Sequence, residues 1–106
     1  MTTSAPRPSG PGSLPVIALQ GEFDYASVPG LQARIDTAVN THGGLILDAG
    51  AVTFVDSTVV TLILMTHQRT HLRIAGLSPH LEHLFGIYGI DQVLHIYPTA
   101  DAAQTA

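Results

Sequence analysis

The sequence of 106 residues contains no lysine and no cysteine. Without lysine, the chain cannot bind phosphate through a P-loop lysine, form a Schiff base, or supply the lysine that receiver-type aspartyl phosphorylation requires. Without cysteine, it has no disulfide, no thiol nucleophile and no cysteine-based zinc site. A reducing compartment is compatible with this composition, and we expect a cytoplasmic protein.

Charge is also scarce. Only 11% of the residues are charged and the formal net charge is −4, whereas roughly a quarter of the residues are charged in an average soluble domain. Nucleic-acid and anionic membrane surfaces need clustered Lys and Arg, so we expect neither as a partner. The longest apolar stretch, Val59–Met65, is far shorter than the roughly 18 residues of a membrane span. A surface with few charges favours a protein partner.

The chain divides into a tail and one domain. Residues 1–13 are rich in proline, glycine and serine and contain no apolar run, so we predict a disordered tail rather than a signal peptide. Residues 14–106 have the length of a single domain. The hydrophobic residues, 45% of the chain, are sufficient for one compact core.

Strand-like and helix-like segments alternate along this domain. Strands are predicted at residues 15–19, 45–47, 71–76 and 93–97, and helices at 29–40, 57–68, 79–88 and after Pro98-Thr99. This alternation predicts an α/β domain with a mostly parallel sheet of four to five strands and helices packed on it. We expect loops at 21–24 and 49–55, with Val52 and Phe54 of the second loop entering the core.

The most distinctive local feature is Asp56-Ser57-Thr58, directly before a helical apolar segment. Each of these residues can cap a helix, so they place short polar side chains at its first turn. Such residues often do nothing more than cap. Helical spacing directs four residues toward the sheet: Val59, Leu62, Ile63 and Thr66. The opposite face is predicted to expose Ser57, Thr61, Leu64 and Gln68, with Thr58 and Met65 at its edge. A hydroxyl followed by apolar surface is typical of a docking site. The alternative is that the neighbouring helix or the tail covers Leu64 and Met65.

Two other groups of side chains could carry chemistry. Asp24, Asp48 and Asp56 follow predicted strands, where a carboxylate cluster could bind a divalent cation or act in acid–base catalysis. Solvated turn aspartates are more common. His80 and His83 stand three residues apart on one helix and could reach a metal ion. No third ligand is evident, and we expect no metal, no cofactor and no catalytic site.

Taken in order, the segments resemble the STAS domain, in particular the bacterial anti-sigma factor antagonists. Gly21-Glu22-Phe23-Asp24 is similar to the Gly-Glu-Leu-Asp turn of that family. Residues 45–48 and 52–58 are similar to its strand and phosphorylation loop. Residues 72–79, 84–85 and 89–91 are similar to its C-terminal half. The likeness extends over residues 14–104.

The resemblance implies a partner-switching function. Ser57, directly after Asp56, would be phosphorylated by a partner that is both the anti-sigma factor and a serine kinase. The unphosphorylated chain would bind this partner and so free the sigma factor that drives transcription, and a serine phosphatase would reset the switch. ATP would belong to the kinase, so the chain itself would not be an enzyme. We predict partner-binding residues at Asp24, Asp56, Ser57, Thr58, Thr61 and Leu64.

The chain departs from the family pattern in two places. Val59 and Thr61 occupy positions where the family usually has glycine. The segment from Asp56 to Leu72 is shorter than usual by about one to two helical turns, so the second helix should end near Arg69. These departures favour a second hypothesis, a STAS-like scaffold without phosphorylation of Ser57, such as an accessory subunit of a transporter or signalling complex.

Overall fold

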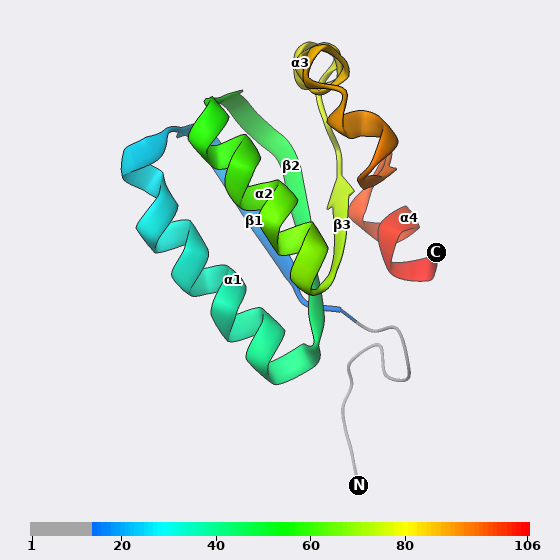
Figure 1. Cartoon of the computed structure of the whole chain (residues 1–106). Helices are drawn as coiled ribbons and strands as arrows, with labels where there is room; N and C mark the ends of the chain where they lie inside the picture. Colours follow the sequence, from blue (N-terminus) through cyan, green and yellow to red (C-terminus); the bar gives the residue numbers. More distant parts are fainter. Residues whose placement is uncertain (1–13) are drawn as a thin grey trace, which may run out of the picture.

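A computed structural model describes residues 14–106, so the tail predicted at residues 1–13 lies outside the described residues. Strands and helices alternate along the described chain (Figure 1). The elements are β1 (Val16–Phe23), η1 (Tyr25–Ser27), α1 (Val28–His42), β2 (Gly44–Val55), α2 (Ser57–Arg69), β3 (His71–Ala75), α3 (Pro79–Tyr88), η2 (Ile90–Gln92), β4 (His95–Tyr97) and α4 (Ala100–Thr105). The two η elements are single 3-10 turns.

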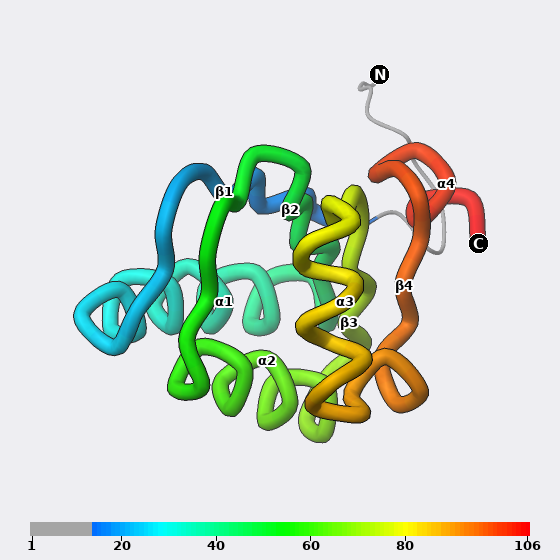
Figure 2. Tube along the Cα trace, turned by 90° about the horizontal axis from the view of Figure 1, so that it is seen from above, coloured from blue at the N-terminus to red at the C-terminus, as the bar shows by residue number. Residues whose placement is uncertain are grey.

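The sheet has four strands in the order β1-β2-β3-β4, and every neighbouring pair is parallel. This confirms the predicted α/β class and the parallel sheet. Helices α1 and α2 cover one face of the sheet, and the short helix α4 lies on the opposite face (Figure 2). Because the strands are parallel, their carboxyl ends meet at a single edge. The turns after β1 and β2 therefore lie side by side.

Two apolar clusters hold these layers together. The main core lies between the sheet and α1, α2 and α3, and its central strand residues Leu45 and Leu47 are almost completely buried. A smaller cluster on the other face contains Ile46, Ala75 and Ala103, which brings α4 onto β2 and β3. The middle strands are therefore buried on both faces, which accounts for their continuous apolar sequence.

Helix α2 packs as its periodicity predicted. The four residues expected to face the sheet are all buried: Val59, Leu62, Ile63 and Thr66. Val60, which the helical spacing did not place on this face, is buried as well. The helix ends at Arg69, where its early end was predicted. Within residues 14–106, no helix has both the length and the apolar character needed to cross a bilayer.

The predicted loop at residues 49–55 was wrong, since β2 continues through it to Val55. Gly50 and the polar Thr53 make this segment look like a turn in the sequence. In the fold it pairs with the second half of β1, from Gln20↔Ala51 to Phe23↔Val55. Two register irregularities in this ladder absorb one extra β2 residue each. That pairing is non-local and leaves no local signal in the sequence.

The same pairing corrects two further expectations. Gly21 does not open a loop, because β1 continues through it to Phe23 with the glycine at a φ of 86°. Phe54 does not enter the core and is 45% exposed, whereas Val52 and Val55 are buried. The irregular register at Glu22 and Phe54 turns the phenyl ring outward. An aromatic side chain therefore lies on the surface close to Asp56.

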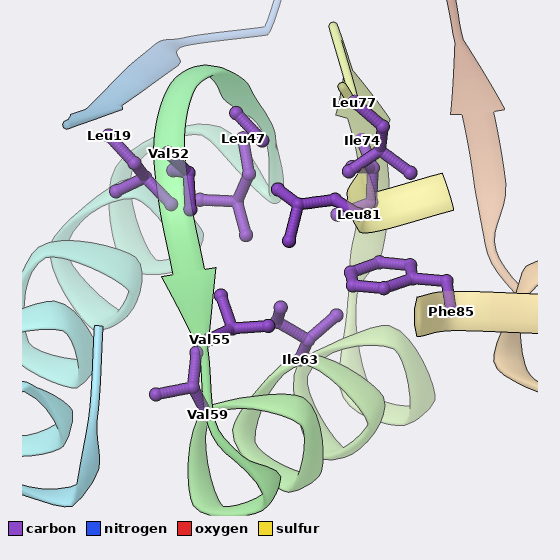
Figure 3. Close-up of a pocket in the computed structure, with 11 residues that line it drawn as sticks. Leu19, Leu47, Val52, Val55, Val59, Ile63, Ile74, Leu77, Leu81 and Phe85 are labelled. Atoms are coloured by element: carbon purple, nitrogen blue, oxygen red, sulfur yellow. The ribbon is translucent and has the colours of Figure 1, made fainter. Parts of the chain in front are cut away.

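A small apolar cavity remains where α2 and α3 meet the sheet. Its volume is about 20 Å³, enough for about one water molecule. Figure 3 shows Val59 and Ile63 of α2 and Leu81 and Phe85 of α3 pointing toward it. Only apolar side chains line it, so we expect it to stay dry. Val59, at one of the two family glycine positions, therefore fills space that a glycine would leave empty.

We predict that Val59→Gly destabilises the domain by about 3 kcal/mol. The change removes a buried side chain, enlarges the existing cavity and places glycine inside a helix. Urea unfolding monitored by circular dichroism would measure the loss.

Thr61→Gly is the matched control, since Thr61 is exposed on the same helix at the other family glycine position. It should cost less than about 1 kcal/mol, mainly through helix propensity. Equal destabilisation by the two substitutions would show that Val59 contributes no packing to the core.

Candidate functional site

The candidate site lies at the edge where β1 and β2 end. The last residues of the two strands are paired, Phe23 with Val55. The backbone N–H of Asp56 donates to the carbonyl oxygen of Phe23 at 3.1 Å. Two residues after Phe23, the N–H of Tyr25 donates to Oδ2 of Asp56 at 3.0 Å. The turn after β1 and the start of α2 are therefore joined into one surface, at the same end of the sheet (Figure 1).

Asp56 is the residue that caps α2. Its Oδ1 accepts from the N–H of Val59 at 3.1 Å and from the hydroxyl of Thr58 at 2.5 Å. These hydrogen bonds hold the pKa of Asp56 below its usual range. The bond from the Thr58 hydroxyl has the largest effect, and the bonds from backbone N–H groups add to it. Asp56 thus carries a full negative charge, which the helix N-terminus stabilises.

Ser57 is the first residue of α2 and is exposed. The expectation that its hydroxyl would cap the helix was wrong, because the Asp56 carboxylate is better placed to reach the N–H of Val59. Two neighbouring hydroxyls are engaged: Thr58 donates to Asp56, and Thr61 donates to the carbonyl oxygen of Ser57 at 2.9 Å. Within residues 14–106, no hydrogen bond engages the hydroxyl of Ser57.

Asp24 shapes the neighbouring turn. Its Oδ1 accepts from the N–H of Ala26 at 3.0 Å, and its own N–H donates to Oγ of Ser27 at 3.2 Å. This reciprocal arrangement is a capping box for η1. Asp24 is exposed and adds a second carboxylate to the surface that contains Ser57.

The apolar part of the surface differs in detail from the expected one. Leu64 is half-buried and packs against the main core. Tyr25 is 73% exposed and Met65 is 59% exposed. Tyr25 was not among the predicted partner-binding residues, because in the sequence it resembles an ordinary turn residue. Its position directly after the Gly21–Asp24 segment was the only signal that could have placed it beside Ser57.

Asp48 does not join the other two carboxylates. It lies within β2, paired with Ala18 and Ala75, and its Oδ1 accepts from the N–H of Gly50 at 3.0 Å. The long β2 separates it from Asp56 by on the order of 25 Å. Across residues 14–106, no three His, Asp or Glu side chains are placed to hold a metal ion, and His80 and His83 are both exposed.

A sequence model of the STAS domain matches residues 5–103 of the chain. The chain belongs to the STAS domain family. A search of the curated proteins found no match.

Solved STAS structures share the fold. An anti-sigma factor antagonist from Mycobacterium paratuberculosis is 25% identical, with a TM-score of 0.75, over 92% of this chain and 96% of that one. The Bacillus cell fate determinant SpoIIAA in its phosphorylated form is also 25% identical, with a TM-score of 0.63, over 83% and 85% of the two chains. The STAS domain of a SulP transporter from Vibrio cholerae is 24% identical, with a TM-score of 0.69, over 93% and 84%.

We predict that Asp56→Ala lowers the melting temperature at about pH 7. Helix α2 loses its N-cap, and the turn at Tyr25 loses its hydrogen bond to the carboxylate. The folded-state pKa of Asp56 lies below its ordinary value of 3.8. Its stabilising effect is therefore complete above the unfolded-state pKa and is lost as the pH falls through the folded-state pKa.

Thermal unfolding at about pH 7 and about pH 2.5 would test this, and the difference between wild type and variant should shrink at the lower pH. Asp101→Ala is the control, since Asp101 is an exposed first-turn carboxylate on α4 that does not cap its helix. A variant at Asp56 as stable as wild type at neutral pH would contradict the capping role.

Proposed function

We propose that this STAS domain is an anti-sigma factor antagonist that binds an anti-sigma factor with serine kinase activity and is released when Ser57 is phosphorylated. The exposed Ser57 beside Asp56 at the start of α2 is the observation that carries the proposal. The likeness to two antagonists, one of them described in a phosphorylated form, supports it. The chain would act by binding alone, and ATP would be supplied by the kinase.

The hydrogen bonds around the site favour Ser57 over its neighbours as the phosphate acceptor. The hydroxyl of Thr58 is held by Asp56 and that of Thr61 by the backbone of Ser57. A kinase would have to break either hydrogen bond before transferring phosphate. The hydroxyl of Ser57 requires no such step and projects from the first position of the helix.

Phosphate on Ser57 would change the interface more than the fold. It adds about −1.5 to −2 charges next to the ionised Asp56. The first-turn N–H groups of α2 and the helix dipole can accommodate this charge while the site is open to water. A partner that covers the site must instead desolvate a phosphate beside a carboxylate. Such a contact would cost on the order of 2–4 kcal/mol of binding.

The partner surface we propose is centred on Asp56, Ser57 and Thr58. Asp24 and Thr61 extend it, with Leu64 contributing only its exposed part. We include Tyr25 and Met65 in this surface as well, because both side chains are apolar and exposed. Aromatic residues at the centre of an interface often provide much of the binding energy. We also propose that a serine phosphatase restores the binding form and that the exchange takes place in the cytoplasm.

The likeness to the SulP transporter domain keeps a second function open. In that case the chain would be a STAS scaffold, an accessory of a transporter or signalling complex, with Ser57 unmodified. Intact-mass measurement after incubation with a candidate partner kinase and ATP would separate the two. One phosphate on wild type and none on Ser57→Ala supports the switch, and unmodified wild type supports the scaffold.

We predict that Ser57→Asp or Ser57→Glu weakens binding to the anti-sigma partner roughly 30- to 1000-fold, because a charge is placed next to Asp56 inside the interface. Ser57→Ala should keep the wild-type affinity. Isothermal titration calorimetry with the purified partner would measure all three. Equal affinities in all variants would reject charge as the signal.

We predict that Tyr25→Ala weakens the same binding at least roughly tenfold while leaving stability within about 0.5 kcal/mol. Tyr25 is highly exposed and adjoins Asp56, so its removal affects the surface alone. The matched control is Tyr88→Ala, which removes an exposed tyrosine from α3. Unchanged affinity for Tyr25→Ala would remove this ring from the proposed interface.

A further inference from the structure

Three histidines meet at the opposite end of the domain from Ser57. His67 lies in the last turn of α2, His71 begins β3, and His95 begins β4. The ring of His95 lies 5.5 Å from that of His67 and 6.4 Å from that of His71, measured between centroids. These residues come from three separate elements, so only the fold brings them together.

Arg73 connects this cluster to the C-terminal helix. Its Nε donates to Nε2 of His71 at 3.0 Å, and its Nη1 donates to the carbonyl oxygen of Ala103 in α4. Arg73 is only 9% exposed. Because a guanidinium can only donate, Nε2 of His71 must carry a lone pair. The arrangement therefore requires a neutral His71.

Helix α4 depends on few attachments. Besides Arg73, two hydrogen bonds of 2.8 Å join the side chain of Gln104 to the backbone of Leu14. Ala103 packs on Ile46 and Ala75. A helix of six residues cannot hold its shape alone in water. Loss of the Arg73 contact should therefore weaken the docking of α4 against the sheet.

The charges around His71 do not offset a proton there. Arg73 faces it from β3 and His95 from β4, with His67 of α2 behind His95. The charged residue of α4, Asp101, is exposed in the first turn of that helix. Among residues 14–106, the ion pair formed is that of Arg69 with Asp36, which does not involve the cluster.

We propose that His71 and Arg73 form a proton-sensitive latch that holds α4 on the sheet at neutral pH and releases it in acid. Protonation would convert Nε2 of His71 from an acceptor into a donor facing a fixed positive charge. Arg73 would then move away from His71, and its hydrogen bond to the carbonyl oxygen of Ala103 would break. The apolar patch of Ile46 and Ala75 would become accessible as α4 detaches.

His71 is exposed overall, but the partial burial of its ring, with the charges of Arg73 and His95, lowers its pKa from the ordinary value of 6.5. The unfolded chain therefore binds this proton more readily than the folded one. The latch contributes its full stability above pH 6.5, and that contribution is lost as the pH falls through the lower folded-state pKa. The Arg73–His71 hydrogen bond therefore makes His71 the group that keeps the latch closed.

Amide hydrogen exchange followed by NMR on the full chain tests the latch. The amide protection factors of Ala103 and Gln104 should fall roughly 3- to 10-fold between about pH 7.5 and about pH 5.5. These factors are corrected for intrinsic exchange and compared with that of Leu47 in β2. His71→Gln keeps an acceptor for Arg73 but cannot titrate, so its α4 should remain protected at both pH values. His83→Gln, at an exposed histidine of α3, should respond like wild type.

Two outcomes of this exchange experiment overturn the proposal: equal protection in wild type at both pH values, or a full response in His71→Gln. Direct NMR of the His71 ring adds a test that needs no variant. We expect Nε2 to be unprotonated at neutral pH, and a proton found there contradicts the latch. The response should also persist in EDTA. A response that EDTA abolishes would point to a bound metal ion instead and would equally overturn the proposal.

Discussion

The carboxylate of Asp56 is the contact on which the candidate site depends. One oxygen closes the first turn of α2, and the other holds the turn that follows β1. Two surface segments from different parts of the chain thereby become one rigid surface around Ser57. The same contacts favour the ionised carboxylate, so the charge that a phosphate would meet is present at neutral pH. The Asp56 carboxylate therefore determines both the geometry and the charge of this site.

The scarcity of charge elsewhere gives each local charge more influence. With no lysine and four arginines, the chain has few cations that could neutralise a new phosphate. Helix α2 has Ser57, the proposed phosphorylation site, at one end and His67 at the other, about 15 Å apart. The proposed switch and the proposed latch thus lie at opposite ends of one helix and would act on different neighbours, a partner at one end and α4 at the other.

Local patterns in the sequence predicted the helices well, and non-local contacts account for what they missed. The buried face of α2 follows from helical spacing alone, and Ser78-Pro79 marked the start of α3 correctly. The second half of β2 could not be predicted, because residues 49–55 become a strand only by pairing with β1. That same pairing leaves Phe54 exposed. The proposed latch joins His71 and Arg73 of β3 to Ala103 of α4, so it requires elements that are distant in the sequence to assemble first.

The two departures from the family glycines have opposite structural consequences. Val59 is directed inward, where it fills the core beside the cavity and stiffens the start of α2. Thr61 is directed outward, and its hydroxyl donates a hydrogen bond to the carbonyl oxygen of Ser57. Neither side chain obstructs Ser57, and both restrain the turn that presents it. The substitutions are therefore compatible with a switch, and they make its presenting helix more rigid than one with glycine at both positions.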